Sequence, residues 1–411
     1  MHKFYKNIRL YNILILFSII IPFTIKSLDL YLISLLSIVF IIYIKFNYTL
    51  KLKEKNTFYI ISIFILVYSI YIIILTIYIK PNLLIYTVNK CIPLFLFLSL
   101  IIYFSNKEYE IKRIKDVIMF SILGICIISI GFYFMGIDGI KMGIHPQIIT
   151  KSENLEWYSE RRMTWLYEHK LKFSTMCMIG TYFAVFNESL SRFKKYILIL
   201  IFIISIFLSN SKTSLPTVII IIISNFILNL FKKMKSIKDM RSLFYYYITL
   251  CITLIISIFS ILLTPRLIAF IGETRDLESL GLRTIIWEYA ISDIIKNPMG
   301  IIKSYGIYLN SGYSNFTTAH NLILNECLET GIIGVSLFII IFVLAFIMIK
   351  GVKNKLIFIV IFALAQVDYL ISGTFVYIFW ILMALLVADK QIIYTKHNIL
   401  KIKRYEEILD D

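Results

Sequence analysis

The 411-residue sequence contains little charge, proline or glycine for its length. Asp, Glu, Lys and Arg make up 16% of the residues, with seven Pro and fifteen Gly. Such low Pro and Gly contents exclude a collagen-like or low-complexity chain. The five cysteines are scattered, with no C-x-x-C pair and no histidine close to any of them. A disulfide framework or a zinc site is therefore not expected.

Apolar residues are what the sequence has in excess. They make up 59% of the chain, whereas a soluble globular protein contains roughly 45–50%. Lipid must therefore solvate much of the surface. The net charge of +17 does not indicate nucleic acid, because Lys and Arg form short clusters between apolar runs rather than one stripe. Such clusters are typical of segments that flank transmembrane helices on the cytoplasmic side.

Twelve apolar runs approach the length of about 20 residues that a helix needs to cross the hydrocarbon layer. The predicted spans are 10–26, 28–45, 57–79, 83–104, 116–136, 171–187, 195–210, 213–231, 243–263, 325–349, 355–372 and 374–389. The first run lacks a small-residue cleavage site, so it is predicted to be a span and not a signal peptide. The predicted fold is all-α, a single integral membrane domain over residues 1–411 with about twelve transmembrane helices.

The distribution of basic residues gives the orientation of these spans. With the N-terminus in the cytoplasm, the cytoplasmic segments hold 27 of the 42 Lys and Arg residues. The positive-inside rule then predicts that both termini are cytoplasmic. Two long segments, 137–170 and 264–324, become external loops, and loops of this size are usually functional. The short outer connections hold only Lys26, Lys80, Lys90 and Lys212.

The second long loop contains a predicted amphipathic helix from residue 283 to 295. Its apolar residues follow a helical period, and helix-stop residues follow it at Asn297, Pro298 and Gly300. A helix of this kind is expected to lie on the membrane surface. The residues of its predicted apolar stripe are Trp287, Ala290, Ile291 and Ile294.

Arg283 is unusual because it belongs to this stripe and also lies in the first turn, where the helix dipole disfavours a cation. An anionic ligand would explain both features, since helix N-termini and guanidinium groups bind phosphate. Alternatively, Arg283 extends to water or pairs with Glu288.

The segment 317–335 carries a histidine at the start of a predicted span. At helical spacing, His320 shares a face with Leu324, Cys327, Gly331 and Gly334. Small residues on that face let another helix approach closely, which would put His320 at the outer mouth of a tight helix seam. A histidine there is suited to general-base catalysis near neutral pH. A lone histidine is more often structural, but its position next to the Arg283 helix favours the catalytic interpretation.

Two further basic sites lie on the predicted outer side. Arg161 and Arg162 end the first long loop among aromatic residues, a pattern that an interfacial aromatic belt explains equally well. Lys212 lies in the polar turn SNSKTS at 209–214.

These segments, in this order and on this topology, resemble the O-antigen polymerase and ligase family, which includes the Wzy-type polymerases. The strongest match is His320-Asn321 followed by Gly331 and Gly334 on the loop that enters a span. Arg162 corresponds to an arginine in the family's earlier loop, and Ser211-Lys212 stands where the family commonly has Ser-Arg. The family's Arg…Trp…Pro-x-Gly pattern is matched by Arg283, Trp287, Pro298 and Gly300.

The resemblance implies a GT-C-like glycosyltransferase in a bacterial inner membrane that needs no metal or cofactor. Its donor would be a glycan on undecaprenyl diphosphate. Arg283, with Arg161, Arg162 or Lys212, would bind the diphosphate, and His320 would take the proton from the incoming sugar hydroxyl. The implied partners are undecaprenyl-diphosphate-linked glycans, membrane lipid, a chain-length regulator and a flippase, and no nucleic acid.

Three functions remain open at this stage. A polymerase would join repeat units into a surface polysaccharide such as O-antigen or capsule, and we favour it. A ligase that moves a finished glycan to lipid A core or another acceptor would share every motif. A transporter or flippase with twelve spans would need ionisable groups near the bilayer midplane, whereas nearly all charges lie at span ends or in loops, Asp368 being the nearest exception.

Overall fold

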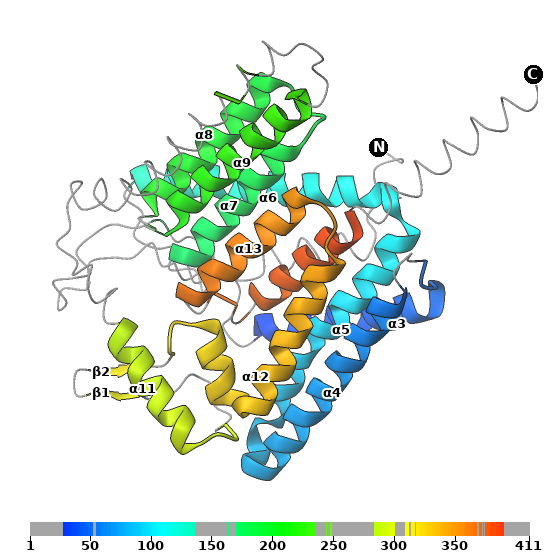
Figure 1. Ribbon diagram of the computed structural model, residues 1–411, viewed down its shortest axis with the longest axis vertical. Helices are drawn as coiled ribbons and strands as arrows, with labels where there is room; N and C mark the ends of the chain where they lie inside the picture. Colours follow the sequence, from blue (N-terminus) through cyan, green and yellow to red (C-terminus); the bar gives the residue numbers. More distant parts are fainter. Residues whose placement is uncertain are drawn as a thin grey trace, which may run out of the picture. The chain divides into compact units, whose positions relative to one another are not determined.

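In the computed structural model, the part of the chain whose structure is described consists almost entirely of helices (Figure 1). The chain divides into two compact units, one formed by Met1–Ile118 with Arg283–Asp411 and the other by Met119–Leu282. The structure describes residues 28–51, 55–135, 163, 170–209, 211, 213–234, 244, 247–248, 283–300, 309–311, 314–316, 318–367, 370–371, 373 and 375–389.

Ten of the twelve predicted spans coincide with helices. They are α3 (Leu28–Asn47), α4 (Lys55–Ile79), α5 (Leu84–Asn106), α6 (Glu108–Met135), α7 (Lys170–Phe186), α8 (Arg192–Leu208), α9 (Ser214–Met234), α12 (Leu322–Met348), α13 (Val352–Val367) and the helical segment Phe375–Asp389. The spans predicted at 10–26 and, almost entirely, 243–263 lie outside the described residues, so the total of twelve stays a prediction. Five helices of the described part are long and apolar enough to cross a membrane. The prediction of a polytopic helical membrane protein is confirmed.

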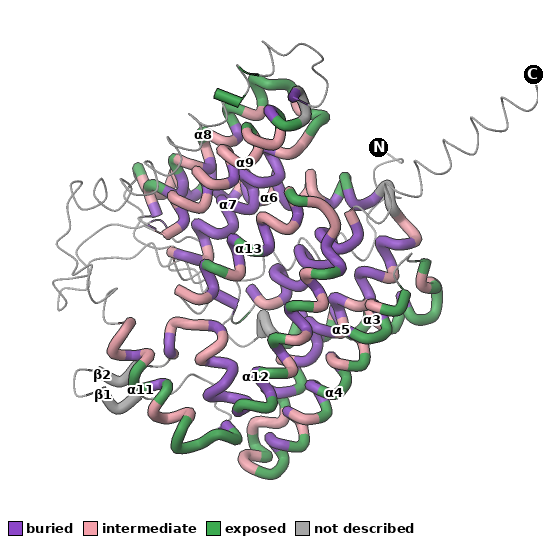
Figure 2. The backbone as a smooth tube through the Cα atoms, in the orientation of Figure 1, coloured by how far each residue is buried: buried purple, intermediate pink, exposed green. Residues whose placement is uncertain are grey.

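The first unit is built around α4 and α5, which a short 3₁₀ turn, η2 (Pro81–Leu83), connects. α3 packs on α5, and α12 packs on α4. α4 is apolar on all sides, and residues exposed to the surroundings recur between its buried residues (Figure 2). Its exposed face carries Ile63, Ile70, Ile74 and Ile77 at helical spacing. An exposed apolar stripe of this length suits contact with lipid.

α12 is not the single continuous helix that the sequence predicts. Gly331 lies within it at φ 72° and ψ −176°, which is not a helical conformation. α12 therefore consists of a short half, 322–330, and a long half, 332–348, and the chain turns sharply where they meet (Figure 1). Hydropathy does not reveal the break because apolar residues continue on both sides of it.

The predicted loops are only partly described. In the second loop, α11 (Arg283–Lys296) matches the amphipathic helix predicted at 283–295. Two short strands, β1 (Leu309–Ser311) and β2 (Ser314–Phe316), form an antiparallel hairpin in which Leu309 pairs with Phe316. Of the first loop, 137–170, only Met163 and Lys170 are described.

The second unit contains α7, which packs against both α8 and α9. Gly180 of α7 permits this approach, because a Cβ there would lie 2.7 Å from the Phe202 ring of α8. Serine hydroxyl groups connect the start of α9 to α7 and to the polar turn that precedes α9. Ser214 hydrogen-bonds Ser174 at 2.7 Å and Ser211 at 3.0 Å.

Candidate functional site at the junction of α11 and α12

α11 packs directly on the segment that enters α12. A small apolar core joins the two elements, and the indole Nε1 of Trp287 donates a hydrogen bond of 2.9 Å to the carbonyl oxygen of Ala319. The helix that begins at Arg283 is thereby attached to the residue that precedes His320. The buried members of this core are Ile286, Ala290, Ala319 and Leu328.

Only part of the predicted apolar stripe of α11 packs against α12. Ala290 is buried in the contact, whereas Ile291 is 48% exposed, and Ile286, which lies outside the predicted stripe, is 1% exposed. Trp287 and Ile294 are half-buried at the edge of the contact, with Ile294 packed against the core. The contact with α12 therefore determines which residues of the helix are buried.

His320 does not belong to a helical face, in contrast to the prediction. It lies before the first helical residue, Leu322, and its φ is +49°. Its predicted alignment with Gly331 and Gly334 is also wrong because the helix breaks at Gly331. Non-glycine residues rarely adopt the left-handed region, which costs roughly 1–2 kcal/mol. Such strain persists only where the surroundings hold it, and it is common at functional sites.

Asn321 connects this strained residue to two helices. Its side-chain Oδ1 accepts a hydrogen bond of 3.0 Å from the backbone N–H of Leu324, which caps the N-terminus of α12. Its Nδ2 donates at 3.0 Å to the carbonyl oxygen of Gln366 in α13. The residue after His320 is therefore fixed between α12 and α13.

The Pro-x-Gly motif closes the break in α12. Ile332 cannot form a regular helical bond across the break, and its N–H donates to the carbonyl oxygen of Pro298 at 2.9 Å instead. The Tyr71 hydroxyl of α4 donates to the carbonyl oxygen of Thr330 at 3.0 Å. Backbone groups freed by a helix break must be satisfied in this way when water is excluded.

Two glycines make this closure possible. A Cβ on Gly300 would lie 2.5 Å from the Gly331 backbone nitrogen, and a Cβ on Gly331 would lie 2.5 Å from the Pro298 oxygen. Both glycines have positive φ, 86° and 72°. Gly334 serves a different purpose, because a Cβ there would collide with the Thr330 side chain and would also approach the Tyr71 ring to 3.1 Å. Pro298, Gly300 and Gly331 thus form close backbone contacts around the break.

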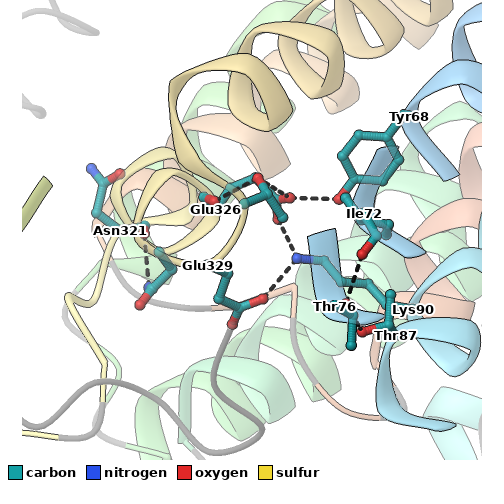
Figure 3. A network of polar contacts seen from close by, with 10 residues as sticks. Tyr68, Ile72, Thr76, Thr87, Lys90, Asn321, Glu326 and Glu329 are labelled. Atoms are coloured by element: carbon teal, nitrogen blue, oxygen red, sulfur yellow. Dashed lines mark hydrogen bonds and ion pairs between the residues drawn. The ribbon is translucent and has the colours of Figure 1, made fainter. Parts of the chain in front are cut away.

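A buried ionic cluster lies between the short half of α12 and α5 (Figure 3). The Lys90 Nζ of α5 lies 2.7 Å from an oxygen of Glu326 and 2.7 Å from an oxygen of Glu329. The Tyr68 hydroxyl donates to the other Glu326 oxygen at 2.5 Å, and the Thr330 hydroxyl lies 3.2 Å from that oxygen. The side chains of Glu326 and Glu329 are 4% and 7% exposed.

This cluster corrects the placement of Lys90 in a short outer connection, because Lys90 lies inside α5. A signal for it does exist in the sequence. Glu326 and Glu329 are three residues apart, hence on one face of a strongly apolar helix, and Lys90 interrupts another apolar run. Buried charges are normally paired, so two acids and one base in separate spans predict contact without identifying the partners.

The cluster borders a cavity of about 90 Å³. Leu322 and Glu326 of the short half of α12 line it together with Phe338 of the long half. Lys90 and Trp380 complete the polar and aromatic parts of the wall. At a share of about 30 Å³ per molecule in the liquid, the volume suits a few waters. The short half of α12 thus has His320 at its start and a cavity along one side.

The sequence model of the O-antigen ligase family matches residues 197–339. The resemblance to the O-antigen polymerase and ligase family is therefore confirmed. No curated protein sequence matches the chain as a relative. The chain is a multi-pass membrane protein with a domain of a family of membrane enzymes in polysaccharide assembly.

The O-antigen ligase match contains most of the predicted site residues. The structure brings the elements of Arg283 and His320 together through α11 and α12, and both side chains are half-buried. Arg161, Arg162 and Lys212 lie outside the described residues, so their role in diphosphate binding stays a prediction. The motif residues that the structure places around α11 and the start and break of α12 are Trp287, Pro298, Gly300, Asn321, Gly331 and Gly334.

The break in α12 can be tested with Gly331→Ala. The new Cβ would meet the Pro298–Met299 backbone, and alanine would also have to adopt a positive φ. We expect a loss of roughly 2–4 kcal/mol from overpacking and conformational strain together, read as a lower thermal midpoint of the purified protein in detergent. Gly124→Ala in α6 is the matched control, because nothing lies within 4 Å of its Cβ. Equal midpoints for the two variants would contradict this account of the break.

Proposed function

We propose that the protein is a membrane glycosyltransferase that polymerises undecaprenyl-diphosphate-linked repeat units into a surface polysaccharide. The observation that carries the proposal is the junction of α11 and α12. Trp287 and the small apolar core hold the helix of Arg283 against the residue before His320. A cation suited to diphosphate and a base suited to a sugar hydroxyl thus come from adjacent elements, although they are 37 positions apart in the sequence.

In this proposal, the two residues act on opposite partners of one transfer. Arg283 binds the diphosphate of the lipid-linked donor and stabilises the negative charge that develops as the diphosphate leaves. His320 accepts the proton of the acceptor hydroxyl, whose oxygen forms the new bond to the sugar carbon. Arg161, Arg162 and Lys212 are proposed as further diphosphate ligands.

The proposal also includes the setting of the reaction. The protein would lie in a bacterial inner membrane with both termini in the cytoplasm and the reacting loops on the outer side. The donor glycan, membrane lipid, a chain-length regulator and a flippase are the proposed partners, and the chemistry requires no metal or cofactor.

Two other functions each have one supporting observation. The matched family is described as O-antigen ligase, which favours transfer of a finished glycan to an acceptor such as lipid A core. The buried cluster of Lys90, Glu326 and Glu329 is the kind of group that a transporter would use. The family match supports glycan transfer over transport.

A deletion strain separates the three functions by the glycans that accumulate. A polymerase deletion should leave single repeat units on the final acceptor, with no ladder of longer products in gel electrophoresis. Long glycans that stay on the lipid carrier would instead identify a ligase and refute the polymerase. Lipid-linked single units that remain on the cytoplasmic face of the membrane would identify a flippase and refute both transferases.

A further inference from the structure

The side chain of Asn325 connects the residues on either side of His320, whose backbone has a left-handed conformation. Asn325 lies one helical turn into α12 and is 2% exposed. Its Oδ1 accepts a hydrogen bond of 3.0 Å from the backbone N–H of Ala319, and its Nδ2 donates one of 2.8 Å to the carbonyl oxygen of Asn321. Those two residues flank His320 in the sequence. One amide group therefore connects the chain before the histidine to the chain after it.

The orientation of this amide is unambiguous because its two partners differ. Ala319 offers an N–H, which only Oδ1 can accept, and Asn321 offers a carbonyl oxygen, which only Nδ2 can bond. The carbonyl oxygen of Asn321 also accepts the backbone N–H of Asn325 at 2.9 Å. An apolar side chain or a carboxylate at position 325 could not reproduce both side-chain bonds.

The two hydrogen bonds of the Asn325 side chain restrain the backbone of His320. A rotation of φ at His320 from +49° to the ordinary negative range would redirect its side chain, and the flanking bonds of Asn325 oppose that rotation. Ala319 is further tied to α11 by Trp287, and Asn321 to α13 through Gln366. Among the side chains that make these described hydrogen bonds, only that of Asn325 bonds both to the residue before His320 and to the residue after it.

We infer that Asn325 is a positioning residue that aims the imidazole of His320 at the acceptor hydroxyl. The inference rests on the proposed role of His320 as a base. It assigns to Asn325 no contact with substrate. Its loss should therefore lower the rate of the chemical step and leave donor binding nearly unchanged, because misplacement of a reacting group by about 1 Å can cost around 10²-fold.

The test uses full-length protein in detergent and, as donor, the undecaprenyl-diphosphate-linked glycan extracted from the deletion strain. Asn325→Ala should lower kcat about 10–100-fold with KM within about threefold of the wild-type value. In a His320→Asn background, the same change should cause no further loss, because coupled residues are not additive. If Asn325→Ala inserts poorly, Asn325→Asp serves instead, since it keeps the acceptor for Ala319 but loses the donor to Asn321.

Asn354→Ala is the matched control. Asn354 is also a buried asparagine of the first unit, with bonds of 3.3 Å to the Leu386 oxygen and 3.1 Å to Asp389. It should leave kcat unchanged even if it lowers protein abundance. A second readout is the rate at which diethyl pyrocarbonate modifies His320, measured by mass spectrometry, which Asn325→Ala should raise severalfold and Asn354→Ala should not.

The outcomes separate this inference from the proposed function. A normal kcat for Asn325→Ala, together with an inactive His320→Asn protein, would overturn the positioning role alone. A normal kcat for His320→Asn would overturn the base and the positioning residue together. A rise in KM with unchanged kcat would show that Asn325 serves binding instead, and would also overturn the inference.

Discussion

Replacement of His320 by asparagine is expected to lower turnover by about 10²–10⁴-fold, the usual contribution of a general base. Asparagine gives a more specific test than alanine, because it adopts positive φ more readily than other non-glycine residues do. It should keep the backbone at the observed +49°, while its amide cannot take a proton near neutral pH. The measurement is polysaccharide formed per amount of inserted protein, with abundance determined by immunoblot.

His320→Gly is the companion variant. Glycine adopts positive φ without strain, so it removes the imidazole and relieves the backbone at the same time. A base would be lost in both variants, and both should be inactive at normal abundance. If both variants instead produce normal polymer, His320 serves the shape of the turn and not the chemistry. If both disappear from the membrane, its role is in folding.

The sequence predicts those parts of the fold that depend on local pattern. Long apolar runs predicted ten helices that the structure contains, and the helical period with its stop signals predicted α11 within one residue. The Pro298-x-Gly300 pattern and the His320-Asn321 pair were each recognisable as part of a family signature. In each case, the information lies within a short stretch of chain.

The failures concern contacts between distant segments. A glycine in an apolar helix can serve close packing or a break. The sequence alone does not distinguish Gly334, which leaves room for the Thr330 side chain, from Gly331, which interrupts the helix. The break at Gly331 is possible because the carbonyl oxygen of Pro298 accepts the hydrogen bond of the Ile332 N–H. Pro298 lies 34 positions before Ile332 in the chain. The same limit applies to His320, because its conformation depends on Asn325.

The ion-pair partners of Lys90 could likewise not be predicted from the local sequence. A lysine near the end of an apolar run is expected to reach water, and no local feature indicates that its partners lie more than 230 positions later. The identity of the partners became visible only through the packing of α4, α5 and the short half of α12. The site could therefore be predicted as a set of residue types, but its supporting contacts could not.

Lys90→Met is expected to destabilise the protein by about 3–5 kcal/mol, because removal of one partner from a buried ion pair leaves an uncompensated charge. Here two carboxyl groups, Glu326 and Glu329, would lose the ammonium group that lies 2.7 Å from each. The hydrogen bonds of Glu326 to Tyr68 and Thr330 remain but supply no positive charge. The measurement is the thermal midpoint of the purified protein in detergent, with abundance in the membrane as a second readout.

Lys115→Met is the matched control for the loss of a lysine ion pair. Lys115 lies 2.7 Å from Asp389 and is about as exposed as Lys90, at 21% against 19%. Its partner Asp389 is 28% exposed, however, against 4% and 7% for Glu326 and Glu329, and pairs near solvent contribute only about 0–1 kcal/mol. The neutral combination Lys90→Met, Glu326→Gln and Glu329→Gln should recover most of the lost stability, since it removes the buried charge altogether. Its activity then separates a structural cluster from a transport site. Normal polymer from the neutral variant supports the structural role, whereas a stable but inactive protein would contradict it and make the charges themselves part of the function.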